Sequence, residues 1–123
     1  MLYGDSAARL NIIGRLYERL IDDELRNSVG AVYTPDSTLR FMVALSKLFV
    51  GRFRGTKIVE PACGSGHFYR HIYREYVNEV LQDQRDHGHP PDAGAAHSEA
   101  LDHIYGRDVD PFAVQLTLLG TFP

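Results

Sequence analysis

Two acidic residues and a glycine-rich turn are the part of this sequence best suited to bind a ligand. Glu60 ends a β-like run, Thr56–Glu60, and the tight turn Pro61–Gly66 (PACGSG) then leads into a helical segment. Asp108 ends a second such run, His103–Asp108. Open α/β sheets bind ligands at the carboxyl ends of their strands, where an acidic side chain can accept hydrogen bonds from ribose hydroxyls. The pattern predicts a nucleoside site, although a turn of this kind can also serve close packing alone.

The spacing excludes two common nucleotide-binding fingerprints. The phosphate loop GxxxxGK[ST] is absent from the sequence. The dinucleotide fingerprint GxGxxG needs a third glycine, but Tyr69 occupies that position. The fingerprint also places its acidic residue roughly 20 positions after the turn, whereas Asp108 follows Gly66 at about twice that separation. The ligand that remains is an adenosine derivative without a pyrophosphate.

Two helical segments precede the first strand. Apolar residues at helical spacing predict an amphipathic helix over Asp5–Leu25. Asp36 or Ser37 is expected to cap a second helix that runs to Val50 and ends at Gly51. Because its apolar residues run almost all round, we expect this second helix to be largely buried.

The segments after the turn complete an alternating pattern. A third helix is expected over His67–Gln84, and the polar residues 86–98, with their prolines and glycines, predict a poorly ordered loop with no part in ligand binding. Asp110 as N-cap and Pro111 as first helical residue begin a last helix, Phe112–Leu119. This order implies two parallel strands joined by a crossover helix. Parallel strands are normally flanked by further strands, so we expect part of an open α/β domain.

Composition and charge narrow the class of protein. The chain is 44% hydrophobic and 24% charged, as in soluble globular proteins, and its net charge of −3 argues against a nucleic-acid-binding surface of its own. The single cysteine, Cys63, excludes an intramolecular disulfide and favours a reducing, cytoplasmic setting. No apolar run approaches the ~18 residues of a membrane span, and no signal peptide is evident. The histidines of residues 86–92 lack a second pair of ligands at regular spacing, so no metal site is expected.

Three stretches resemble the motifs of one enzyme family, and they occur in the same order. Val59–Phe68 (VEPACGSGHF) strongly resembles [DE]PACGSGxF, the first S-adenosylmethionine-binding motif of amino-methylating DNA methyltransferases. Gly30–Pro35 (GAVYTP) is similar to the motif that precedes the catalytic domain in the adenine-N6 group, and Tyr105–Pro111 (YGRDVDP) is similar to the second cofactor motif. The resemblance implies a partial Rossmann-like α/β methyltransferase fold of restriction–modification or phage-defence type. A helical segment, 1–51, would then precede a truncated β-α-β-α cofactor-binding unit, 52–123.

The resemblance also implies roles for individual residues. The implied S-adenosylmethionine-binding positions are Tyr33, Thr34, Pro35, Glu60, Pro61, Ala62, Cys63, Gly64, Gly66, Asp108 and Val109. In the family pattern, residues 33–35 line the methionine end, Glu60 faces its amino group, and residues 62–66 wrap the methionine and ribose. Asp108 binds the ribose hydroxyls, and Val109 packs on the adenine ring.

One family motif is missing. The [DNS]PP[YF] tetrapeptide, which holds the amino group of a flipped adenine, does not occur, and the only double proline lies in His89–Asp92. We therefore expect a fragment without catalytic residues, inactive alone, whose parent contacts duplex DNA through downstream regions. Two alternatives stay open: a catalytically silent binding or assembly module that self-associates through its sheet edges, and a piece of a protein- or RNA-directed methyltransferase.

Overall fold

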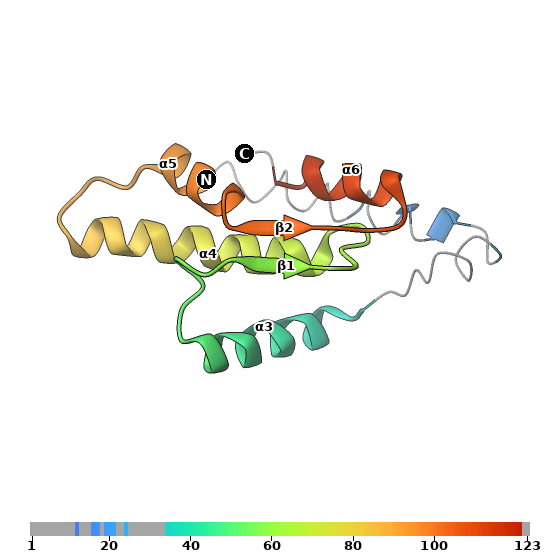
Figure 1. The fold of residues 1–123 in the computed structure, drawn as a ribbon, viewed down its shortest axis with the longest axis horizontal. Helices are drawn as coiled ribbons and strands as arrows, with labels where there is room; N and C mark the ends of the chain where they lie inside the picture. The colour runs from blue at the N-terminus through green and yellow to red at the C-terminus, as the bar shows by residue number, and fades with distance from the viewer. Residues whose placement is uncertain (1–11, 13–15, 18, 22–23, 25–33, 122–123) are drawn as a thin grey trace.

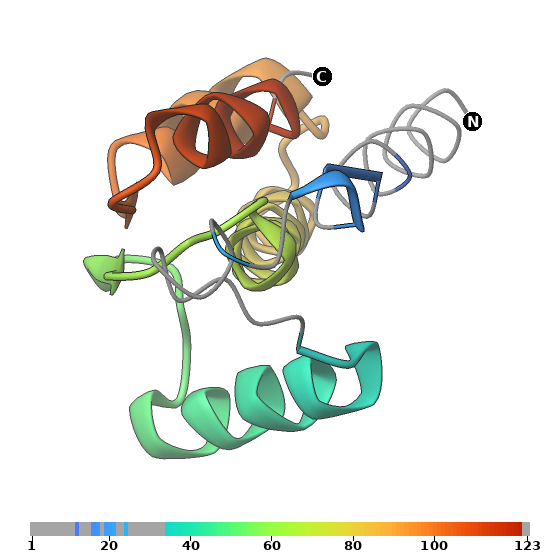
Figure 2. The same ribbon diagram turned by 90° about the vertical axis from the view of Figure 1, so that its right-hand side faces the viewer.

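A long central helix organises the fold of the chain. The computed structural model describes residues 12, 16–17, 19–21, 24 and 34–121. In chain order the elements are α3 (Asp36–Val50), β1 (Ile58–Glu60), α4 (His67–Asp86), α5 (Ala93–Leu101), β2 (Ile104–Gly106) and α6 (Pro111–Leu119). In both ribbon views α3 lies on one side of α4, and α5 and α6 lie on the other (Figures 1 and 2).

The two strands are parallel neighbours, as the sequence predicts. Ile58 pairs with Ile104, and Glu60 pairs with Gly106. One face of this small sheet packs on α4, and Tyr76 and Val80 are fully buried in the core beneath it. The strands thus end together beside the first turn of α4 (Figure 1).

Several predicted elements are confirmed. The second helix ends at Val50 as predicted, and Gly51 follows it with the positive φ of 79° that favours glycine. The third predicted helix begins at His67 as expected and continues two residues beyond Gln84. Asp110 caps α6, because its Oδ1 accepts from the N–H of Phe112 at 2.9 Å, and Pro111 occupies the first turn.

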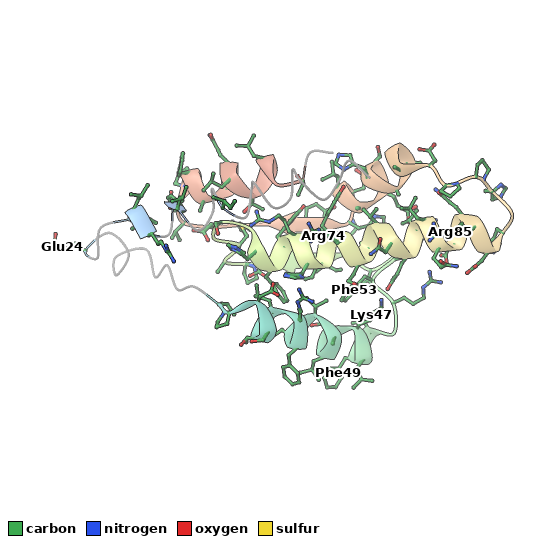
Figure 3. The ribbon with its side chains drawn as sticks, turned by 180° about the vertical axis from the view of Figure 1, so that it is seen from behind. Glu24, Lys47, Phe49, Phe53, Arg74 and Arg85 are labelled. Carbon is green, nitrogen blue, oxygen red and sulfur yellow. The ribbon has the colours of Figure 1, made fainter. Side chains whose placement is uncertain are left out.

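The predicted burial of α3 is wrong. Only Leu39 and Val43 are buried on this helix, whereas Leu48 and Phe49 are 79% and 81% exposed. Figure 3 shows the reason: Lys47 points toward α4, and Phe49 points away from it. Of the described elements, α4 makes the main contact with α3, and most of the apolar surface of α3 stays outside the core.

The predicted cap of α3 also needs correction. Pro35 occupies the N-cap position and makes no side-chain capping bond. Asp36 instead lies in the first turn, where its carboxylate pairs with Arg40 and with His71 of α4. A carboxylate there still interacts favourably with the positive end of the helix.

The flexible loop predicted over residues 86–98 is wrong in its second half. Residues from Ala93 form α5, capped by Asp92, whose Oδ1 accepts from the N–H of Ala95 at 2.9 Å. Ala96 and Ala100 are completely buried against the core. Small residues let α5 approach α4 closely, so this segment is part of the packed structure.

Other sequence predictions fall outside the described residues. Most of the helix predicted over Asp5–Leu25 lies there, and so does Tyr33. Among the residues that are described, no helix is both long and apolar enough to cross a membrane.

Candidate functional site

The carboxyl ends of β1 and β2 are joined by backbone hydrogen bonds. The N–H of Arg107 donates to the carbonyl of Glu60 at 2.9 Å, and the N–H of Cys63 donates to the carbonyl of Arg107 at 2.8 Å. The two acidic residues singled out by the sequence therefore lie at the same end of the sheet, Glu60 as the last residue of β1 and Asp108 in the loop after β2.

Asp108 connects its own loop to the glycine-rich turn. Its Oδ2 accepts from the N–H of Gly64 at 2.8 Å, and its Oδ1 accepts from the N–H of Asp110 at 2.9 Å. Each carboxylate oxygen has two lone pairs, so each can still accept a bond from a ligand hydroxyl. The carboxylate is thus oriented before any ligand arrives.

The two glycines of the turn are needed for different reasons. Both have positive φ, 51° at Gly64 and 84° at Gly66. A Cβ added at Gly64 would meet nothing within 4 Å, but one added at Gly66 would lie 2.7 Å from Oγ1 of Thr117. Gly64 therefore presents an open surface to a ligand, whereas Gly66 permits close packing against α6.

The amides of the turn are largely committed within the protein. The N–H groups of Cys63, Gly64 and Gly66 donate to Arg107, Asp108 and the Cys63 carbonyl respectively. A phosphate cradle depends on unpaired N–H groups that point at the anion. These three amides are therefore not available to bind a phosphate group, which agrees with the absence of a phosphate-loop sequence.

The electrostatics of the site favour a cation. Burial raises the pKa of the half-buried Glu60 above its usual value; the N–H of Ala62 opposes this, and the negative charge of Asp108 raises it further. Two carboxylates that repel one another are stabilised most by a ligand that carries positive charge and donates hydrogen bonds from hydroxyl groups. The site therefore suits a cationic nucleoside better than a nucleotide.

Side chains from α4 and α6 hold the turn in place. The buried guanidinium of Arg70 donates to the carbonyl of Ser65 at 2.8 Å, and the hydroxyl of Thr117 donates to the carbonyl of Gly64 at 3.0 Å. Neither Arg70 nor Thr117 was predicted from the sequence to contact the turn. The sequence shows only that both residues lie in helical segments, and a helical pattern does not predict which turn a side chain contacts.

Comparison with known proteins matches the chain to a family. Residues 8–122 match the family model described as N-6 DNA Methylase. The chain belongs to this family. Enzymes of the N-6 DNA methylase family generally depend on S-adenosylmethionine.

Two curated relatives support the same assignment. The chain is 29% identical over 107 residues to the adenine-specific methyltransferase PglX of Streptomyces coelicolor, a match that covers 85% of this chain and 8% of the relative. It is 28% identical over 83 residues to the type I restriction enzyme EcoEI methylase subunit of Escherichia coli, covering 67% of this chain and 16% of the relative. The chain thus spans less than a fifth of each relative. No solved structure matches it significantly.

The structure brings most of the cofactor-binding positions predicted from the sequence to one place. Glu60, Gly64, Gly66 and Asp108 gather at the strand ends, whereas Thr34 and Pro35 precede α3. The 2.9 Å contact of Asp36 with His71 places the start of α3 near the same end of α4. Three further predicted cofactor-binding residues are exposed to solvent: Pro61, Ala62 and Val109.

Cys63 is placed as a structural residue of the turn. Its side chain is 5% exposed, and burial raises the pKa of its thiol. A protonated, buried thiol is a poor nucleophile, which favours the packing role over a catalytic one. Within the described part of the chain, no three His, Cys, Asp or Glu side chains are grouped to hold a metal ion.

Proposed function

We propose that the chain is the S-adenosylmethionine-binding portion of a DNA adenine-N6 methyltransferase of restriction–modification or phage-defence type. Residues 52–123 would form a partial Rossmann-like cofactor unit. The observation that carries this proposal is the bond between Asp108 and the Gly64 N–H, which unites the two cofactor motifs with Glu60 in one acidic site.

The residues fit the chemistry of this cofactor. S-adenosylmethionine carries a positive sulfonium and a positive α-ammonium group, and the site offers two carboxylates, of which that of Asp108 is held by the backbone N–H groups of Gly64 and Asp110. In the proposed complex Glu60 binds the ammonium group and Asp108 accepts from the ribose hydroxyls. The open surface at Gly64 allows the ligand to approach the backbone.

The cofactor, when bound, supplies an electrophilic methyl group. The part of this chain is to bind and orient it, since positioning contributes much of the catalysis of such a transfer. The sequence contains no [DNS]PP[YF] tetrapeptide, so we assign no catalytic residue to these 123 residues. We propose that the target adenine and the duplex DNA are held by other regions of a longer protein.

A second function class is favoured by one observation. The exposed apolar residues of α3 would suit a catalytically silent assembly module. A protein- or RNA-directed methyltransferase is a weaker alternative. The matching family is named for DNA methylation, one relative is named as adenine-specific, and the other is a subunit of a restriction enzyme.

Calorimetric titration with S-adenosylmethionine tests the leading proposal. We expect measurable binding by the wild-type chain, weakened roughly ten- to a hundredfold by Asp108→Ala, as loss of charge-assisted hydrogen bonds predicts. Asp102→Ala, which changes an exposed acid just before β2, is the matched control and should bind normally. Tritiated-methyl transfer to adenine-containing duplex DNA should be absent for the chain alone. No binding by the wild type, or equal binding by Asp108→Ala, would overturn the assigned site.

A further inference from the structure

The two peptide groups that flank the Cα of Gly64 are each held by a side-chain hydrogen bond. The N–H of Gly64 donates to Oδ2 of Asp108 at 2.8 Å, and its carbonyl accepts from Oγ1 of Thr117 at 3.0 Å. The first contact comes from the loop after β2, and the second comes from the last turn of α6, more than fifty residues along the chain from Gly64. Rotation of either peptide group would break one of these bonds, so the two partners together fix the backbone conformation at Gly64.

Thr117 also determines how closely the turn approaches α6. Its side chain is 3% exposed, and its Cα would lie 2.9 Å from a Cβ added at Gly66. The single hydroxyl proton goes to the Gly64 carbonyl, with Sγ of Cys63 a weaker neighbour at 3.7 Å. One side chain therefore lies against Cys63, Gly64 and Gly66 of the turn.

We propose that Thr117 is a positioning residue for the cofactor turn, whose hydroxyl holds Gly64 in the orientation that binds S-adenosylmethionine. This inference rests on the proposed function. Thr117 contacts the turn from α6, and in the proposed complex the ligand meets the open side of Gly64, so Thr117 acts through the backbone.

Paired substitutions separate positioning from general packing. Thr117→Val keeps the shape but removes the hydroxyl, and Thr117→Ser keeps the hydroxyl. Thr121→Val is the matched control, because Thr121 is similarly buried and its hydroxyl donates to the carbonyl of Leu118 at 2.7 Å, away from the turn. If Thr117→Val does not fold, Thr117→Ala against Thr117→Ser gives the same comparison.

Two readouts are measured for each variant at a temperature below its unfolding transition. The first is the affinity for S-adenosylmethionine by calorimetry, which Thr117→Val should weaken roughly three- to tenfold while Thr117→Ser and Thr121→Val remain close to wild type. The second is the backbone amide resonance of Gly64 in the ligand-free chain, which should move in Thr117→Val only.

The outcomes distinguish this inference from the proposed function. Equal losses of affinity in Thr117→Val and Thr121→Val, or an unmoved Gly64 resonance in Thr117→Val, would overturn the positioning role. A wild-type chain that does not bind S-adenosylmethionine would overturn the proposed function, and the resonance would still decide whether Thr117 orients the turn.

Discussion

The Oδ2 atom of Asp108 lies 2.8 Å from the backbone nitrogen of Gly64, so a single hydrogen bond ties the end of β2 to the turn after β1. This bond makes one site from two motifs that stand far apart in the sequence. It also withdraws the Gly64 N–H from ligands, which leaves the carboxylates as the polar groups best placed to select one. A cationic ligand with hydroxyl groups follows from that arrangement.

The glycines of the turn should respond differently to alanine. Gly64→Ala should cost only the strain of a positive φ, about 1 kcal/mol, so the chain should still fold. The added methyl group should, however, block the approach of the ligand to the turn. Gly66→Ala adds a clash with Thr117 and should destabilise the fold by several times that amount. Gly88→Ala, at φ 74° with open space around it, is the matched control for strain alone.

Thermal unfolding and calorimetry check these three variants. We expect Gly64→Ala and Gly88→Ala to lose similar stability, and only Gly64→Ala to lose affinity for S-adenosylmethionine. Equal affinity in these two variants would show that the open face of Gly64 does not meet the ligand.

The packing of α5 is open to a direct test. Ala96→Leu forces a large side chain into a completely buried position, which typically costs about 1–3 kcal/mol. Ala95→Leu places the same side chain one residue earlier, on the exposed face, and should change stability by less than about 0.5 kcal/mol. Denaturant unfolding measures both. Similar stabilities would mean that this segment behaves as the loop expected from its composition.

The contrast between α5 and α6 indicates how much the sequence could predict. Asp110-Pro111 is a strong start signal with a regular apolar segment behind it, and α6 was predicted closely. The α5 segment AGAAHSEAL buries only alanines and follows two prolines, so it lacks the large apolar residues from which periodicity is recognised. Its helix is stabilised by contacts with α4, which a local pattern does not contain.

The candidate site, like the helices, was predictable only where local sequence signals exist. The glycine turn and the strand-end acids are local signals, and the structure brings them together. The contacts of Thr117 and Arg70 with the turn depend on how α6 and α4 pack, and burial of α3 depends on which elements cover it. Such relationships are set by tertiary structure and not by spacing along the chain.

The connection between α3 and β1 should make folding stability sensitive to acid. Burial would raise the pKa of Glu79, but the N–H of Arg54, the ammonium of Lys47 and the N–H of Phe53 outweigh it and lower the pKa below 4.5. A lowered carboxyl pKa contributes stability at higher pH that is lost as pH falls through that pKa. Glu79→Gln should therefore cost about 1–3 kcal/mol at neutral pH and flatten the loss of stability below about pH 4.5.

Glu75→Gln is the control for this prediction. Glu75 pairs with the same ammonium group of Lys47 at 2.9 Å but is more exposed, so its loss should cost at most about 1 kcal/mol. Urea unfolding at several pH values gives the comparison. A pH profile for Glu79→Gln that parallels the wild type would contradict the assigned role of Glu79.

The outer surface of α3 predicts self-association. Phe41, Leu48 and Phe49 are 65%, 79% and 81% exposed, and contiguous apolar surface of this kind promotes association. Sedimentation velocity at tens of micromolar should detect dimers or larger species of the wild type, and Phe49→Glu should shift the population toward monomer. Ser98→Glu adds the same charge at an exposed position of α5 and should leave association unchanged. A monomeric wild type would refute this prediction.

The affinity for S-adenosylmethionine should depend on pH through Glu60. Its pKa is raised above 4.5, first by burial and then by the charge of Asp108, against the opposing effect of the Ala62 N–H. A cationic ligand binds the ionised carboxylate, so affinity should fall as acidification protonates Glu60, and the fall should begin at a higher pH than an ordinary glutamate would give. Glu60→Gln should bind about tenfold more weakly at neutral pH and lose this pH dependence, whereas Glu75→Gln should keep both properties of the wild type. Calorimetric titrations across the acidic range measure the effect. A pH profile that Glu60→Gln leaves unchanged would assign the cation contact to another group.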